Sequence, residues 1–299
     1  MASLPTTPDP RPISAEPDEL RRATPHWLEV WNAFRLSIVA LVSLGVLLLL
    51  AFAAAFAPWL APYSPTEVNP MDILQGPSGL HWWGTDDLGR DIYSGALYGL
   101  RISMTVGAMA GLVAALLGTV IGALAGFLGG WVDALLMRFT DFVLTIPVIF
   151  LALVLIPVFG SSRLIVILVI GGLAWPSIAR LVRAEFLKLR SEAFVEAARG
   201  YGARRFKLIF SEILPNTFDL VLVATALQIP AAILIEAGLS FLGVGDPEPR
   251  SLGLMLKDAY GLLGLAWWSA VFPGLVLSAL AISLNLVADA FNDAVRGHE

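Results

Sequence analysis

The residue types that usually carry catalysis or metal binding are scarce in this chain. It has no cysteine, and none of its three lysines follows a glycine, so the phosphate-binding loop of nucleotide hydrolases is missing. No His-Glu-x-x-His pair is present either, which excludes the usual zinc-protease pattern. The histidines all lie outside the apolar stretches, at His26, His81 and His298. We therefore predict that the chain is not an enzyme and holds no metal or cofactor.

One carboxylate stands alone in an apolar surrounding. Glu236 is the only charge deep within an apolar run, with the polar Gln228 earlier in the same run. A carboxylate within a membrane is costly, so it normally faces a partner or a water-filled cavity. Two interpretations remain open: Glu236 is hydrogen-bonded to a neighbouring helix or reached by external water, or it lines a solute path together with Gln228.

The composition decides which elements must position these residues. The chain has 299 residues, of which 57% are hydrophobic and 14% charged, and its mean hydropathy is +0.78. Soluble domains average about 45–50% apolar and about 25% charged residues, so the charges here are too few to cover a soluble surface. The net charge of −5 argues against a nucleic-acid partner, which needs a basic surface. The remaining class is an all-α protein with several spans in a lipid bilayer.

Six stretches are apolar for about the 20 residues that a membrane-crossing helix needs. They cover residues 36–57, 103–127, 142–159, 164–179, 218–244 and 266–288. The first is too long for a cleaved signal peptide, whose apolar core has about 7–15 residues, and is read as a retained anchor helix. The predicted organisation is a cytoplasmic tail 1–35 (disordered at its proline-rich start, then amphipathic), a first transmembrane helix 36–57, an extracytoplasmic loop 58–101, a five-helix core 102–290 containing an internal loop 180–217, and a cytoplasmic tail 291–299.

The positive charges predict the orientation. With the N-terminus inside, 14 of the 19 lysines and arginines fall on internal segments and five on external ones. Lysine and arginine are enriched in cytoplasmic loops, so both termini are predicted to be cytoplasmic.

Small residues recur at every third or fourth position of the second stretch, at Gly107, Gly111, Ala115, Gly118, Gly122 and Gly126, with Gly130 just beyond. Membrane helices pack through such residues because they let two backbones approach closely. The stripe favours packing within the chain, with a subunit interface as the alternative.

The internal loop carries the most specific pattern. Residues 191–215 predict two helices separated by Gly200 and Gly202, the first with Ser191 as its N-cap. In the second helix, Phe206, Ile209, Phe210 and Ile213 would form an apolar face, and Pro215 would end it. The first helix offers a surface of small and acidic residues that suits a protein groove; an amphipathic segment resting on anionic lipid is the alternative.

Glu196-Ala197-Ala198, Gly202 and Leu214-Pro215 resemble the EAA motif of ABC-importer permeases. In that family this loop is the coupling helix, which the ATP-binding subunit grips. The resemblance therefore implies that ATPase coupling falls on Glu192, Phe194, Glu196, Ala197, Ala198, Gly202, Leu214 and Pro215.

A second block narrows the resemblance. The run before the second stretch is similar to the external loop of the C-type permeases of dipeptide and oligopeptide importers, and its matching residues are Gly84, Thr85, Asp86, Gly89, Arg90 and Asp91. On physical grounds we expect a short helix here, its aspartates at the N-terminal end and its apolar face on the membrane surface. Contact with a soluble binding protein is the alternative.

The resemblance implies a type I ABC-importer permease architecture with six transmembrane helices in a bacterial or archaeal cytoplasmic (inner) membrane. Its expected function is ATP-driven import of peptides or related small solutes. The expected partners are a second homologous permease, two ATP-binding subunits that hold the ATP and Mg, and an extracytoplasmic solute-binding protein. An ion-coupled secondary transporter is the alternative function. Such carriers typically have repeated halves, and no short repeat is apparent in this sequence.

Overall fold

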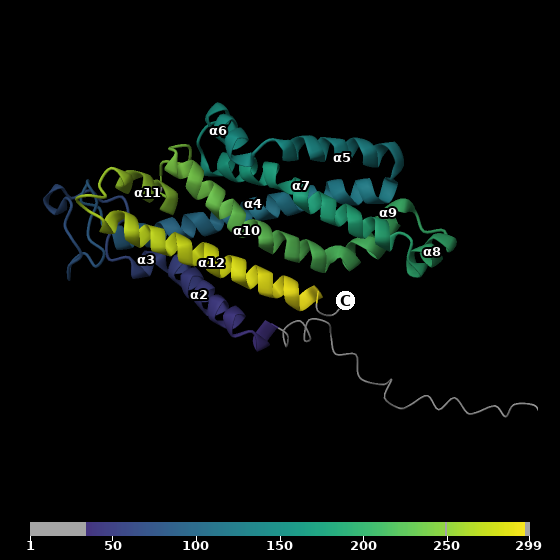
Figure 1. The fold of residues 1–299 in the computed structure, drawn as a ribbon, viewed down its shortest axis with the longest axis horizontal. Coiled ribbons are helices and arrows are strands. Elements are labelled where there is room, and N and C mark those ends of the chain that lie inside the picture. Colours follow the sequence, from purple (N-terminus) through teal and green to yellow (C-terminus); the bar gives the residue numbers. More distant parts are fainter. Residues whose placement is uncertain (1–33, 249, 297–299) are drawn as a thin grey trace, which may run out of the picture.

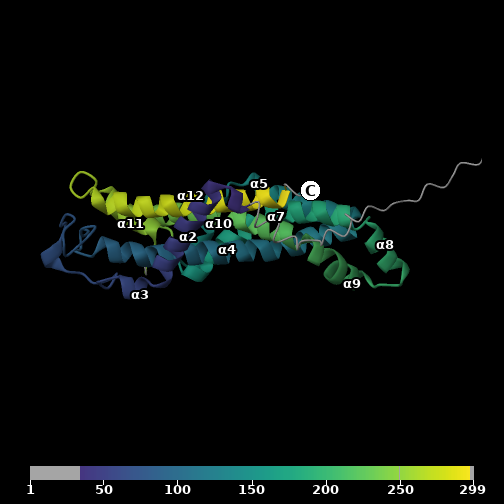
Figure 2. The same cartoon turned by 90° about the horizontal axis from the view of Figure 1, so that it is seen from below.

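The protein is an elongated bundle of helices in the computed structural model, which describes residues 34–248 and 250–296 (Figure 1). Within these ranges the only extended pairing is a single bridge between Thr85 and Asp91. The helices run along the long axis, with a loop-rich end and a helical projection at opposite ends (Figure 2). The elements are α2 Ile38–Ala55, α3 Ala57–Leu60, η2 Pro70–Asp72, α4 Ile92–Leu128, α5 Gly130–Thr145, α6 Val148–Phe159, α7 Arg163–Leu189, α8 Ala193–Gly200, α9 Arg205–Lys207, η3 Leu208–Ile213, η4 Leu214–Thr217, α10 Phe218–Phe241, α11 Leu252–Tyr260 and α12 Trp268–Arg296.

Five helical segments of the described chain are long and apolar enough to cross a membrane. They are Ile38–Ala55, Ile92–Leu128, Arg163–Leu189, Arg205–Phe241 and Trp268–Ala294. The prediction that residues 142–159 form a third continuous span is wrong, because these residues do not form one continuous helix. The chain bends by 89° between α5 and α6, so a sixth span exists only if this bent pair counts as one.

Proline explains the break between α5 and α6. Pro147 has no backbone N–H to continue the helix, and it pushes the preceding residue out of the helical region. Ile146 accordingly has an extended backbone, with φ −95° and ψ 122°. The prolines inside the other spans, such as Pro176 in α7 and Pro230 in α10, leave their helices continuous.

The helix expected after the aspartates of the external block is present, with Asp91 at its start and Ile92, Ala96, Leu97 and Leu100 buried on one side, but it is not a separate short helix. Residues 84–91 make a tight loop closed by the Thr85–Asp91 bridge, and one 37-residue helix, α4, begins directly after it. Asp91 is the N-cap: its Oδ1 accepts a hydrogen bond from the backbone N–H of Ser94 at 2.7 Å. The external loop therefore ends at Asp91, about three helical turns before residue 101.

The glycine stripe of α4 packs within the chain. Its C-terminal half meets α7, where a Cβ at Gly122 would lie 2.5 Å from the carbonyl oxygen of Ala179, and one at Gly126 would lie 2.6 Å from the Cβ of Phe186. Its N-terminal half meets α10, because Gly107 and Gly111 face Ile233 and Ile229. The prediction of intrachain packing is confirmed for these positions. Gly130 instead lies beyond α4, with open space around it.

The internal loop differs from the expected pair of helices in its second half. Pro215 does not end a helix; α9, the π-turn η3 and the 3-10 turn η4 lead into α10 as one apolar segment from Arg205 to Phe241. The expected apolar face is confirmed in part. Ile213 is buried and Ile209 packs against the same cluster, whereas Phe206 and Phe210 are 72% and 50% exposed and Leu208 is buried instead.

The observed helix ends change the predicted boundaries of the C-terminal tail and the internal loop. The N-terminal tail prediction for residues 1–33 lies outside the described residues, as does the end of the C-terminal tail at 297–299. Residues 291–296 continue α12 instead of forming a tail. Likewise α7 extends to Leu189, so Arg180 and Arg183 belong to a helix and not to the internal loop.

Candidate functional site

Two groups of predicted site residues lie at opposite ends of the molecule. The projecting end holds the coupling segment, which we define as residues 190–217 and which contains α8 and α9 (Figure 2). The other end holds the external loop and α11 (Figure 1). The structure therefore brings together the members of each group and keeps the two groups apart.

The helix α8 is anchored by one apolar side chain. Val195 is fully buried and belongs to a cluster with Phe186 of α7 and with Leu208 and Ile213 of η3. We did not predict Val195 as an anchor from the sequence, although Val195 is the only aliphatic residue larger than alanine in this helix. Ser191 is not the N-cap: Glu192 occupies that position, and the Ser191 hydroxyl donates to the carbonyl of Lys188 at 2.8 Å.

The rest of α8 is turned outward. Glu192, Phe194, Glu196 and Ala197 are exposed, and Ala198 is half-buried. This surface carries small and acidic residues together with the Phe194 ring, which is 41% exposed, and the exposed Arg199 in the last turn. Because the buried Val195 fixes the opposite side, α8 presents a rigid shallow face to solvent.

A groove follows α8. It is lined mainly by polar side chains and glycine, and its lining includes Ala198, Tyr201, Gly202, Arg204, Lys207 and Glu212. Gly202 has φ +83°, a left-handed backbone conformation that favours glycine. Leu214 packs half-buried against the Val195 cluster, whereas Pro215 is exposed. The motif residues thus divide into an exposed face on α8 and a support beneath it.

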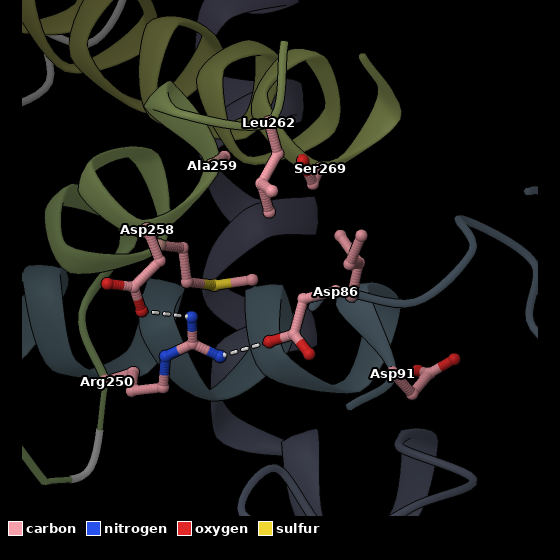
Figure 3. A pocket seen from close by; sticks show the side chains of 9 residues that line it. Asp86, Asp91, Arg250, Asp258, Ala259, Leu262 and Ser269 are labelled. Carbon is pink, nitrogen blue, oxygen red and sulfur yellow. Dashed lines mark hydrogen bonds and ion pairs between the residues drawn. The ribbon is translucent and has the colours of Figure 1, made fainter. Parts of the chain in front are cut away.

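At the other end, Asp86 belongs to an ion-pair cluster with Arg90, Arg250 and Asp258. Figure 3 shows Arg250 between Asp86 and Asp258. Arg90 Nε and Arg250 Nη1 donate to Asp86 Oδ2 at 2.8 and 2.9 Å, and Arg250 Nη2 donates to Asp258 Oδ2 at 2.5 Å. The cluster ties the loop before α4 to the segment that leads into α11. The cavity beside it measures about 10 Å³, room for at most one water, so it is no solute site.

The other residues of the external motif shape the loop. A Cβ on Gly89 would overlap the carbonyl oxygen of Asn69, and both Gly84 and Gly89 have positive φ. Thr85 donates its hydroxyl to the carbonyl of Asp72, and its own carbonyl accepts the indole N–H of Trp268 at 3.2 Å. The residues of the predicted motif therefore fix the conformation of the loop before α4.

The surroundings of Asp86 shift its pKa. Burial by itself would raise the pKa of this carboxyl, but the backbone N–H groups of Arg90 and Leu88 and the positive charges of Arg90 and Arg250 outweigh it. The net pKa of Asp86 is lowered. A carboxyl with a lowered pKa in the folded state contributes stability above its unfolded pKa of about 3.9, and that stability is lost as the pH falls through the folded pKa.

We expect Asp86→Asn to weaken the external end at neutral pH by about 3 kcal/mol, because Arg250 and Arg90 lose a buried partner. The acid-side decline in the thermal unfolding midpoint, below about pH 4, should also become shallower than in the wild type. The matched control is Asp87→Asn, since the adjacent Asp87 side chain is exposed. Equal midpoints for the two variants at pH 7 would contradict the role of the cluster.

Glu236 lies between helices and not at a surface. Its side chain is 3% exposed, and its two carboxylate oxygens accept hydrogen bonds from Ser103 of α4 at 3.1 Å and from Ser240 of α10 at 2.7 Å. This geometry favours the interpretation of a hydrogen-bonded carboxylate that joins two helices. Gln228 is half-buried, and its amide donates to the hydroxyl of Ser177 in α7 at 2.9 Å.

Comparison with known proteins identifies the family and the fold of the chain. Residues 118–297 match the family described as binding-protein-dependent transport system inner membrane component, and residues 26–77 match the N-terminal TM domain of oligopeptide transport permease C. The chain belongs to this family of ABC-importer permeases. The predicted family, the all-α membrane fold and the permease function are thereby confirmed.

Relatives match the permease over nearly its full length. The dipeptide transport system permease protein DppC of Alkalihalophilus pseudofirmus is 36% identical over 287 residues, which cover 96% of this chain and 94% of that protein. The glutathione transport system permease protein GsiD of Salmonella typhimurium is 42% identical over 282 residues, covering 94% and 92%. An inward-facing methionine ABC transporter MetNI shares the fold, with a TM-score of 0.54 and 21% identity over 67% of this chain and 94% of that one.

Family membership settles the class of transport. The permease is a multi-pass protein of the inner membrane, its ATPase is a separate subunit, and it works with a binding protein. It binds no cofactor itself. The alternative of an ion-coupled secondary transporter is therefore set aside.

Proposed function

We propose that this permease forms half of the path through which an ATP-driven importer takes up peptides, including short peptides such as dipeptides and glutathione. The observation that carries the proposal is the sequence identity of 36% and 42%, over nearly the whole chain, to permeases named for dipeptide and for glutathione transport. The other half of the path would come from a second homologous permease, and two ATP-binding subunits would supply the energy.

The coupling segment is the proposed contact with the ATP-binding subunits. Its support is the exposed, rigid face of α8, which lies at the end of the molecule where the helices α4 and α7 finish (Figure 2). Closure of the ATP-binding subunits would pull α8, and α7 would transmit the movement because both pack on the Val195 cluster. Such a change needs contacts that differ between the two states, which a rigid projecting helix can provide.

The proposed orientation places both termini and α8 in the cytoplasm. The described start of α2 and the end of α12 point toward the same end of the bundle as α8 (Figure 1). The excess of lysine and arginine in the segments at that end agrees with this orientation. The external loop and α11 would then face the solute-binding protein.

The function is tested by reconstituting the permease with its partner permease, ATP-binding subunits and binding protein in vesicles that orient the binding protein outside. With ATP enclosed and ionophores present, we expect continued accumulation of a labelled dipeptide or of glutathione. Vesicles with a non-hydrolysable ATP analogue are the control. Accumulation of neither solute above that control would contradict the proposed substrate class.

A further inference from the structure

Four polar side chains form a row on an outward face of three neighbouring helices. We call them the polar row: Asp141 of α5, Ser177 and Arg180 of α7, and Gln228 of α10. In Figure 1, α7 runs between α5 and α10, and the polar row bridges α7 to both of these helices. Arg180 Nη2 binds Asp141 Oδ1 at 2.5 Å, and Gln228 Nε2 donates to Ser177 Oγ at 2.9 Å.

The row lies near half depth of the bundle. Along α7, Ser177 is about 21 Å from Arg163 and about 18 Å from Leu189 at 1.5 Å per residue. Arg180 is one turn closer to the cytoplasmic end. A hydrocarbon core about 30 Å thick that begins at Arg163 would end near Arg183. Ser177 and its partner Gln228 would then lie inside this core, and their short side chains would not reach the headgroups from a lipid-facing surface.

Asp141, Ser177 and Arg180 are exposed and Gln228 is half-buried, although their neighbours on the same helices are apolar. The Arg180 and Asp141 side chains are 53% and 62% exposed, and Leu181 and Phe142 beside them are 42% and 63% exposed. An ion pair facing hydrocarbon at this depth would be costly, so the row must face water or polar groups of a partner.

A second ion pair already joins α5 and α7, so the Arg180–Asp141 pair is not needed to hold these two helices together. Arg183 of α7 binds both carboxylate oxygens of Asp133 in α5 at 2.5 and 2.7 Å, and these side chains are only 33% and 16% exposed. Glu236 is likewise fully enclosed by its serine partners. Among these polar contacts between spans, the polar row is the part that stays open on the bundle surface.

We propose that the polar row is this chain's wall of the aqueous solute path, and that Arg180 and Asp141 receive the carboxylate and the ammonium of a zwitterionic peptide. This inference rests on the proposed function. An exposed ion pair contributes little to stability, about 0–1 kcal/mol, so exchanging it for the charged ends of a solute costs little. The planar guanidinium of arginine also suits a carboxylate, which it can bind through two parallel hydrogen bonds.

The first test uses single cysteines, for which this chain is suited because it has none of its own. Ser177→Cys, Arg180→Cys and Gln228→Cys in the assembled complex are treated with a charged methanethiosulfonate, and the mass of this chain reports the reaction. The matched control is Leu168→Cys, also on α7 and 48% exposed, but on its apolar face. We expect the three row positions to react at least about tenfold faster, because the reactive thiolate forms in water and not in lipid. Rates equal to that of Leu168→Cys would overturn the proposal.

The second test concerns the ligand chemistry. Arg180→Gln is expected to raise the KM for a dipeptide with free termini by about tenfold or more, since a charge-assisted hydrogen bond is lost, and to change the KM for its amidated form much less. Lys188→Gln removes another exposed, ion-paired charge from α7 as the control. Equal effects on both dipeptides would contradict the assignment. If wild-type vesicles import no peptide at all, the proposed function fails, whereas the cysteine test still decides whether the row faces water.

Discussion

Replacing Gly122 by alanine is expected to destabilise the permease by about 3 kcal/mol, the upper part of the usual range for an overfilled core. A Cβ at this position would lie 2.5 Å from the carbonyl oxygen of Ala179, 2.8 Å from the Cβ of Val182 and 3.1 Å from the backbone N of Arg183. Two of these atoms belong to the backbone of α7, so no side-chain rotation relieves the clash. The two helices must separate, and in lipid their association depends on close contact.

The matched control for this substitution is Gly45→Ala. Gly45 is also a helical glycine in a span, but nothing lies within 4 Å of a Cβ built there. This control should keep or raise the stability, because alanine favours a helix over glycine by about 1 kcal/mol. The measurement is the unfolding midpoint of each purified variant in detergent together with the folded fraction in size-exclusion chromatography. Equal midpoints for the two variants would show that the α4–α7 contact does not depend on a bare glycine.

Replacing Ala197 by tryptophan is expected to uncouple transport while leaving the permease inserted. Ala197 lies on the exposed face of α8, opposite the buried Val195, so the indole meets no core of this chain. On a shallow surface that seats in a partner, a side chain of that size prevents close approach. We expect uptake, and the stimulation of ATP hydrolysis by the loaded binding protein, to fall at least about tenfold, which corresponds to about 1.4 kcal/mol.

The control for this experiment is Ala55→Trp, another exposed alanine, which closes α2 at the far end of the bundle. It should keep both activities. Gly202→Trp would be a less specific probe, because φ +83° at Gly202 strains any side chain whatever its contacts. If Ala197→Trp transports and stimulates ATP hydrolysis as the wild type does, α8 is not the coupling contact.

The sequence was sufficient for the features that repeat along a helix or depend on composition. The low charge content required a membrane, and the small residues at Gly118 and Gly122 predicted a close helix contact inside the chain. Apolar length located five of the spans, because membrane helices satisfy their own backbone hydrogen bonds and need little else from the fold. The motif around Glu196 also pointed to the segment that projects from the bundle.

Other features depended on contacts between distant segments, which periodicity does not encode. The loop before α4 is an example, since Thr85 binds the carbonyl of Asp72 and its own carbonyl accepts the indole N–H of Trp268. Proline alone was compatible with a kink, a break or a continuous helix: the chain breaks at Pro147 but stays helical through Pro176 and Pro230.

The sequence by itself determined the class of the protein and five of its apolar spans, because these are properties of composition and local spacing. Only the tertiary structure decided what the individual polar residues do. Glu236 stood out in the sequence as a lone charge, yet two serines from different helices enclose it. Arg180 and Ser177 were unremarkable in the sequence, yet they lie open beside Asp141 and Gln228, since exposure within a membrane depends on which helix faces meet.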